Sequence, residues 1–125
     1  MKKKIETESA PKALGTYSQA IDTGNTIYLS GQIPLDPITM ELVKGDEEQI
    51  RQVFKNIQAV CEASGVFLDD IIKLNVCLSD LSVFAQVNEV MKELFSEPYP
   101  ARAAIQVAKL PLDSLIEVEG IIVKK

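Results

Sequence analysis

The 125-residue chain is 46% hydrophobic and 25% charged, which fits one globular domain over residues 1–125 and excludes a disordered chain. Its net charge of −5 argues against the clustered Lys and Arg of a nucleic-acid-binding surface, so a nucleic-acid partner is not expected. The absence of histidine removes the commonest general base and the commonest zinc ligand.

The first 45 residues predict two β-strands and a loop. Strands are expected at 17–22 and 26–33, because the Gly-Asn pair between them tolerates the positive φ of a hairpin turn. Prolines end the second strand, so residues 34–45 are expected to form a loop. The lysines at 2–4 are interpreted as a solvated terminus.

An amphipathic helix is expected next. Asp46 is its predicted N-cap, with Gln49 three residues later as in a capping box. Gly65 marks its end, at a position where left-handed backbone is expected. The apolar stripe of this helix consists of Ile50, Val53, Phe54, Ile57, Val60 and Cys61.

The second half of the chain predicts three strands and one helix. A strand is expected at 71–79, and one of its faces carries Ile72, Leu74, Val76 and Leu78. A helix is expected from about 82 to 96, ending before a proline. Two strands follow at 101–107 and 115–123, and the first of them is predicted to be buried.

This order of elements predicts an α+β fold in which two helices pack on one face of a mixed sheet. The other face is not purely polar, because apolar residues lie on both sides of the strands at 26–33 and 115–123. Another subunit is therefore expected to cover it.

Arg102 is an anomaly in the predicted strand at 101–107. Its guanidinium is always charged and presents five N–H donors, while Ala101, Ala103 and Ala104 leave room beside it. Such a group needs an anion. A ligand carboxylate would make this a binding pocket, whereas a protein carboxylate would make it an internal salt bridge, and the sequence leaves both open.

Two further polar side chains stand among apolar positions. Asn88 falls inside the apolar arc of the second helix, where its amide needs either backbone partners or a pocket. Glu117 lies opposite Ile116 on the last strand, on the same face as Glu119. The two acids are either solvated or salt-bridged, or Glu117 occupies a partly dry cleft, where its raised pKa would suit proton transfer near neutral pH.

Four segments carry a family resemblance. They are Ala-Pro-Lys-Ala-Leu-Gly-Thr-Tyr-Ser-Gln-Ala at 10–20, Ser-Gly-Gln-Ile-Pro-Leu-Asp-Pro at 30–37, the run at 99–111 that begins Tyr-Pro-Ala-Arg, and Ile-Glu-Val-Glu-Gly at 116–120. In order and spacing they resemble the Rid family of reactive-intermediate (enamine/imine) deaminases, also called YjgF or L-PSP proteins. The resemblance implies chorismate-mutase-like α+β subunits that assemble as homotrimers with sites between subunits.

The resemblance also implies an activity. This is the cofactor-independent hydrolysis of reactive 2-imino or enamine acids, such as the iminopropanoate derived from 2-aminoacrylate, to 2-oxo acids and ammonia. The catalytic residues it implies are Arg102, which would bind the substrate carboxylate, Glu117, which would orient water and move a proton, and Tyr17. The implied substrate-binding residues are Ser30, Gly31, Asn88, Ala103 and Ala104.

The chain departs from the family pattern at two positions. Thr16 stands where Rid proteins commonly have proline, and Ala104 stands where many have cysteine, which excludes a thiol nucleophile there. Cys61 and Cys77 lie outside the motif. They are expected to be buried thiols in a reducing cytosol.

Three other functions stay open, namely a binding module for 2-oxo acids, an endoribonuclease and a holdase. The acidic charge and the missing histidine count against RNA cleavage. No glycine-rich phosphate loop, dinucleotide fingerprint or metal-ligand spacing is present, so no cofactor and no metal are expected. No apolar run approaches the ~20 residues of a membrane helix and no signal peptide is recognised, so a cytoplasmic protein is expected.

Overall fold

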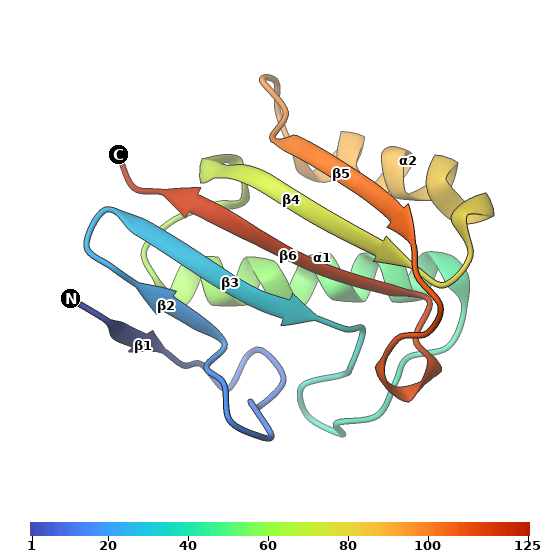
Figure 1. Ribbon diagram of the computed structural model, residues 1–125, viewed down its shortest axis with the longest axis horizontal. Coiled ribbons are helices and arrows are strands. Elements are labelled where there is room, and N and C mark those ends of the chain that lie inside the picture. Colours follow the sequence, from blue (N-terminus) through green and yellow to red (C-terminus); the bar gives the residue numbers. More distant parts are fainter.

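The computed structural model describes residues 1–125 and contains one six-stranded sheet in the order β1-β2-β3-β6-β4-β5 (Figure 1). Its strands are β1 (Lys3–Ile5), β2 (Ala20–Asp22), β3 (Thr26–Gln32), β4 (Ile71–Leu78), β5 (Ala101–Gln106) and β6 (Ile116–Val123). The helices are α1 (Asp46–Ala63) and α2 (Phe84–Leu94), with short 3₁₀ helices at Leu68–Asp70, Leu81–Val83 and Pro111–Asp113.

Both helices cover the same face of this sheet, as Figure 1 shows. Strands β4 and β5 are parallel, and α2 lies in the crossover that joins them. All other strand pairs are antiparallel. The predicted α+β fold, with a mixed sheet and two helices on one face, is confirmed.

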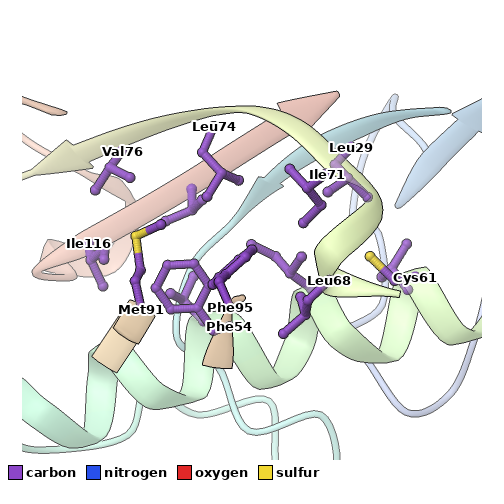
Figure 2. Packing of buried hydrophobic residues seen from close by; sticks show 14 of the residues in the cluster. Leu29, Phe54, Cys61, Leu68, Ile71, Leu74, Val76, Met91, Phe95 and Ile116 are labelled. Carbon is purple, nitrogen blue, oxygen red and sulfur yellow. The ribbon is translucent and has the colours of Figure 1, made fainter. Parts of the chain in front are cut away.

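The hydrophobic core lies between the sheet and the helices. Figure 2 shows Phe54 of α1 and Phe95 between the helix and the strand residues Leu74 and Val76. The two phenyl rings meet edge to face, with centroids 5.8 Å apart and an interplanar angle of 82°. The predicted apolar stripe of α1 is confirmed, because every one of its residues is buried.

The predicted capping box of α1 is wrong. Asp46 is already helical, and Gly45, the actual N-cap, has no side chain with which to cap the helix. The amide of Gln49 bonds elsewhere, since its Nε2 donates to the Val43 carbonyl at 3.1 Å and its Oε1 accepts from the Leu115 amide at 2.8 Å. This side chain joins the loop before α1 to the start of β6, a contact between distant segments that no local motif reveals.

The predicted end of α1 is confirmed. Gly65 has a φ of +77°, and the following amide of Val66 donates to the Cys61 carbonyl at 3.0 Å, closing the helix. The second helix begins later than predicted, because Leu81–Val83 form a 3₁₀ turn that is capped by Asp80.

The first predicted strand is too long. Strand β2 begins at Ala20, so Tyr17 lies in a loop and not on a strand. The N-terminal lysines are also not simply a solvated terminus, because Lys3 and Lys4 pair with β2 through their backbone while their side chains stay exposed. Ile5 explains this pairing, since its side chain is buried in the core.

The predicted inward face of β4 is wrong at one position. The pairing of β4 with β6 shifts between Ile71 and Lys73, which marks a β-bulge. The bulge places Ile71 in the core and leaves Ile72 50% exposed. Strict alternation of side chains along the strand therefore predicted Ile72 in the core, whereas Ile71 is the buried residue.

The strand predicted to be buried at 101–107 is the edge strand β5. It pairs only with β4, and most of its side chains are exposed in the single chain. The run of small apolar residues that suggested burial is therefore open to solvent or to another chain.

The face of the sheet opposite the helices, here called the open face, carries apolar side chains of β3 and β6, as predicted. Tyr28 and Val123 lie there and are 49% and 41% exposed, and Ile105 of the edge strand, for which no face was predicted, is 54% exposed beside them. None of the helices combines the length and the apolar character that crossing a membrane requires.

Candidate functional site

Arg102 lies on the helix-covered face of the edge strand, level with Leu74 of the neighbouring strand. Its Nη1 donates to the side-chain oxygen Oδ1 of Asn88 at 2.7 Å and to the sulfur of Met91 at 3.4 Å. Its Cζ lies 4.9 Å from the centre of the Phe84 ring. The guanidinium is thus held between β5 and α2.

No carboxylate lies within 4.0 Å of this guanidinium, so Arg102 makes no internal salt bridge. The contrast with Arg51 is direct, because Arg51 bonds to both Glu47 and Glu93. Of the two interpretations that the sequence left open, the internal ion pair is wrong for the single chain. The Nε and Nη2 donors of Arg102 bond to no protein group.

An open pocket of about 460 Å³ lies beside Arg102. It is lined by Ala85, Asn88, Glu89, Met91, Lys92, Tyr99, Pro100 and Arg102. Its walls come from α2, from the segment before β5 and from β5 itself. A small carboxylate ligand fits this volume and meets one unpaired cation there.

Glu117 lies on the open face, beside Cys77 of the adjacent strand β4. Its side chain is half-buried against Gly31 and makes neither a hydrogen bond nor an ion pair. Burial raises the pKa of this carboxyl, and the nearby negative charge of Glu119 adds to the rise. Such a group holds and releases a proton closer to neutral pH than an ordinary glutamate does.

The two predicted hydroxyl groups have different surroundings. The Oγ of Ser30 donates to the Ser18 carbonyl at 2.5 Å, so its proton is already used within the chain. The Tyr17 side chain is 53% exposed, and its hydroxyl has no hydrogen-bond partner. Both stand near the point where the N-terminal loop meets β2 and β3.

The predicted site residues divide between the two faces of the sheet. Because side chains alternate along a strand, Ala104 shares the helix-covered face with Arg102, and Ala103 lies on the open face with Glu117. Asn88, on α2, belongs to the first group, and Gly31 belongs to the second. One chain therefore does not bring the guanidinium and the carboxylate together.

Sequence reasoning did not identify Phe84 and Met91 as parts of the site. Both are apolar residues of the arc in which Asn88 falls, so their composition alone indicates core packing. Their spacing from Asn88, four residues before and three residues after it, is the signal that places all three on one side of α2.

The thiols are poor nucleophiles at neutral pH. Burial raises the pKa of Cys61 to about 12, and burial together with Glu117 and Glu119 raises the pKa of Cys77. Cys77 is half-buried, so its prediction as a buried thiol is only partly confirmed. No three or more Cys, Asp or Glu side chains gather in a way that could hold a metal ion.

The sequence matches known proteins over nearly its whole length. The family model described as endoribonuclease L-PSP matches residues 7–124. A RutC family protein of Pyrococcus horikoshii is 53% identical over 126 residues, covering 100% of both chains. The 2-iminobutanoate/2-iminopropanoate deaminase of Dermatophagoides farinae is 44% identical over 98% of this chain and 96% of that one.

Solved structures agree with this match. RidA from an Antarctic Psychrobacter has a TM-score of 0.94 and 55% identity, covering 97% of this chain and 98% of that one. Escherichia coli TdcF with bound serine has a TM-score of 0.92 and 41% identity, covering 98% and 99%. The chain belongs to the Rid family, the family that the matching model describes as endoribonuclease L-PSP.

Proposed function

We propose that this protein hydrolyses 2-imino acids, or their enamine tautomers, to 2-oxo acids and ammonia without a cofactor. The observation that carries this proposal is the unpaired guanidinium of Arg102 at the wall of an open pocket. An arginine without a protein carboxylate, with free donors on one edge, is suited to bind a ligand carboxylate through two parallel hydrogen bonds.

The Glu117 carboxylate supplies the second function that the reaction needs. In its ionised form it accepts a proton from water while the oxygen of that water adds to the C2 carbon of the imine. Glu117 returns this proton to the nitrogen, which gives the 2-amino-2-hydroxy acid. The carboxylate then moves the hydroxyl proton to the same nitrogen, the C–N bond breaks as the C=O bond of the 2-oxo acid forms, and ammonia leaves. The raised pKa of Glu117 matches this double role, because one group must take up the proton and then return it.

The reaction requires a second copy of the chain. Arg102 and Glu117 lie on opposite faces of one sheet, so the substrate is expected to contact Arg102 of one subunit and Glu117 of another. The exposed apolar side chains of the open face support such an assembly. We infer a homotrimer with its sites between subunits.

The names of two relatives support the substrate class. One relative is named a deaminase of 2-iminobutanoate and 2-iminopropanoate, and another was solved with bound serine, an amino acid that also carries a carboxylate next to its nitrogen-bearing carbon. Both ligands present the group that Arg102 is placed to bind.

A coupled assay tests the proposal. A dehydratase generates 2-aminoacrylate from serine, and release of the 2-oxo acid is followed with and without this protein. We expect faster release with the wild-type protein. Arg102→Ala should weaken the binding free energy of the carboxylate by about 1.5–3 kcal/mol, or roughly ten- to a hundred-fold in affinity. Arg102→Lys should recover little, because an ammonium group cannot make the bidentate contact. Dialysis against a chelator should leave the rate unchanged.

A binding module for 2-oxo acids is the second candidate, since the same arginine and the bound serine of TdcF also fit a protein that only senses its ligand. Such a protein would bind 2-oxobutanoate through Arg102 without speeding hydrolysis of the imine. Because the family model is described as an endoribonuclease, RNA cleavage is a third possible result of the assay. RNA cleavage that is lost in Arg102→Ala, in a protein that does not hydrolyse the imine, would favour a nuclease over a deaminase.

A further inference from the structure

We propose that Phe84 and Met91 are positioning residues that, together with Asn88, aim one edge of the Arg102 guanidinium at the substrate. This inference rests on the proposed function, because it concerns how Arg102 grips a carboxylate. In this proposal the two residues act through the arginine, and neither supplies a group that bonds to the substrate carboxylate.

The three residues occur at positions i, i+4 and i+7 of α2, so they form one stripe along the helix. This stripe faces the edge strand, where Arg102 meets all three of its members. The Phe84 ring covers the guanidinium at 4.9 Å from Cζ, within the range of a cation–π contact.

These contacts occupy the donors at one end of the guanidinium. Its Nη1 nitrogen carries two N–H bonds, and the structure gives that nitrogen two acceptors, Oδ1 of Asn88 at 2.7 Å and the sulfur of Met91 at 3.4 Å. The remaining donors are those of Nε and Nη2, which lie along one side of the planar group. This is the pair that bonds a carboxylate side-on, so the stripe selects which edge is free.

All three groups of the stripe are electrically neutral. They fix the plane and the rotation of the guanidinium without cancelling its charge, whereas Arg51 is neutralised by two glutamates on the surface. Holding a cation with an amide oxygen, a thioether and an aromatic ring keeps its full charge for an incoming anion. Preorganisation of this kind lowers the entropy cost of forming two hydrogen bonds at once.

Binding of 2-oxobutanoate by full-length variants, measured by calorimetry, tests the proposal. Phe84→Leu keeps apolar bulk but removes the ring, and should weaken binding about two- to thirty-fold, the range of a cation–π contact. Phe84→Tyr keeps the ring and should bind within about two-fold of the wild type. Met91→Leu conserves volume but removes the sulfur acceptor, and should also weaken binding.

Phe95→Leu is the matched control, because Phe95 packs against Phe54 at the end of the same helix and is not a partner in the cation–π contact or the hydrogen bonds of the Arg102 guanidinium. It should lower the melting temperature without changing the affinity.

In steady-state kinetics, Phe84→Leu should raise KM with little change in kcat, because Arg102 binds the carboxylate equally well in the substrate and in the transition state. Equal affinity in Phe84→Leu and the wild type, or an equal loss in Phe95→Leu, would overturn the proposal.

A spectroscopic readout separates this proposal from the proposed function. The chain has two arginines, so an Arg102→Lys spectrum assigns the Arg102 Nε–H resonance. The ring current of Phe84 should shift that resonance, and the shift should vanish in Phe84→Leu but persist in Phe84→Tyr. Persistence in Phe84→Leu would contradict the positioning role. A wild type that lacks imine hydrolysis but shows the shift would instead contradict only the proposed function.

Discussion

A Cβ atom at Gly31 would lie 2.8 Å from Oε2 of Glu117 and 2.9 Å from its Cδ, so the glycine leaves the space that this carboxylate occupies. The backbone of Gly31 does not require positive φ, so the residue is needed for room and not for conformation. The carboxylate lies against the backbone of β3, half-buried and without a partner.

Gly31→Ala should therefore displace the Glu117 carboxylate while leaving the fold intact. A misplacement near 1 Å can cost about a hundred-fold in rate, and we expect a loss of that order in turnover at saturating substrate. Gly120→Ala is the contrasting variant, because its Cβ would lie 2.7 Å from the backbone oxygen of Lys73. That variant should lose stability, by about 1–3 kcal/mol in urea unfolding. Full turnover in Gly31→Ala would show that the position of the carboxylate is unimportant.

Asn88→Asp should weaken the binding of 2-oxo acids although it preserves the shape of the side chain. The new carboxylate would pair with Arg102, whose Nη1 lies 2.7 Å from the present amide oxygen. Competition with a charge-assisted hydrogen bond should cost the ligand about 1.5–3 kcal/mol, or roughly ten- to a hundred-fold in Kd by calorimetry. Asn25→Asp, which adds the same charge in an exposed turn, should leave Kd unchanged.

The pH dependence of turnover should follow the ionisation of Glu117. Burial raises the pKa of this group, so the ionised base forms only as the pH rises through that raised value, and kcat should rise with it. Glu117→Gln should show low turnover at every pH while it still binds 2-oxobutanoate. An unchanged pH profile in this variant would exclude Glu117 as the base.

The same shift predicts how stability depends on pH. Because the folded pKa of Glu117 is raised, the folded chain holds this proton more tightly than the unfolded chain does, and stability falls as the pH rises through the raised pKa. The advantage of Glu117→Gln over the wild type in free energy of unfolding should therefore grow with pH. Urea titrations at several pH values measure this difference in the free energy of unfolding. A difference that shrinks as the pH rises would contradict the burial of the Glu117 carboxyl in the folded chain.

Light scattering should find a trimer, because the open face carries apolar side chains that one chain leaves exposed. Ile121→Lys places a charge on that face, beside Tyr28, and should yield monomers that no longer turn over substrate. Phe67→Lys alters a residue that is 68% exposed away from the sheet, and should leave the assembly intact. A wild type that stays monomeric at micromolar concentration would rule out the intersubunit site.

The features that were predictable from the sequence are those set by local periodicity and turn chemistry. The stripe of α1 and the left-handed Gly65 needed only neighbouring residues. Ile72 was misplaced because a bulge in strand pairing is a property of the β4–β6 ladder and not of β4 alone. Burial of the strand carrying Arg102 was also mispredicted, because apolar composition does not show that a strand lies at an edge.

The sequence proposes the candidate site as a set of residues but does not give their arrangement in space. Alternation placed Glu117 opposite Ile116, and this holds in the structure. Whether Arg102 shares a face with Glu117 depends on the order β6-β4-β5 and on the registers between those strands, which no single segment encodes. The sequence also does not decide whether Arg102 pairs with a protein carboxylate, because the groups that surround the guanidinium depend on how α2 packs against β5.

The unpaired Arg102 has a consequence for the effect of ionic strength. The chain carries a net charge of −5, so an approaching 2-oxo acid is repelled at long range and attracted only near the guanidinium. Salt screens interactions beyond a Debye length of about 8–10 Å and leaves the contact itself largely intact. In stopped-flow measurements, the association rate constant for 2-oxobutanoate should therefore rise as salt is added to a dilute buffer, while the dissociation rate constant stays nearly constant.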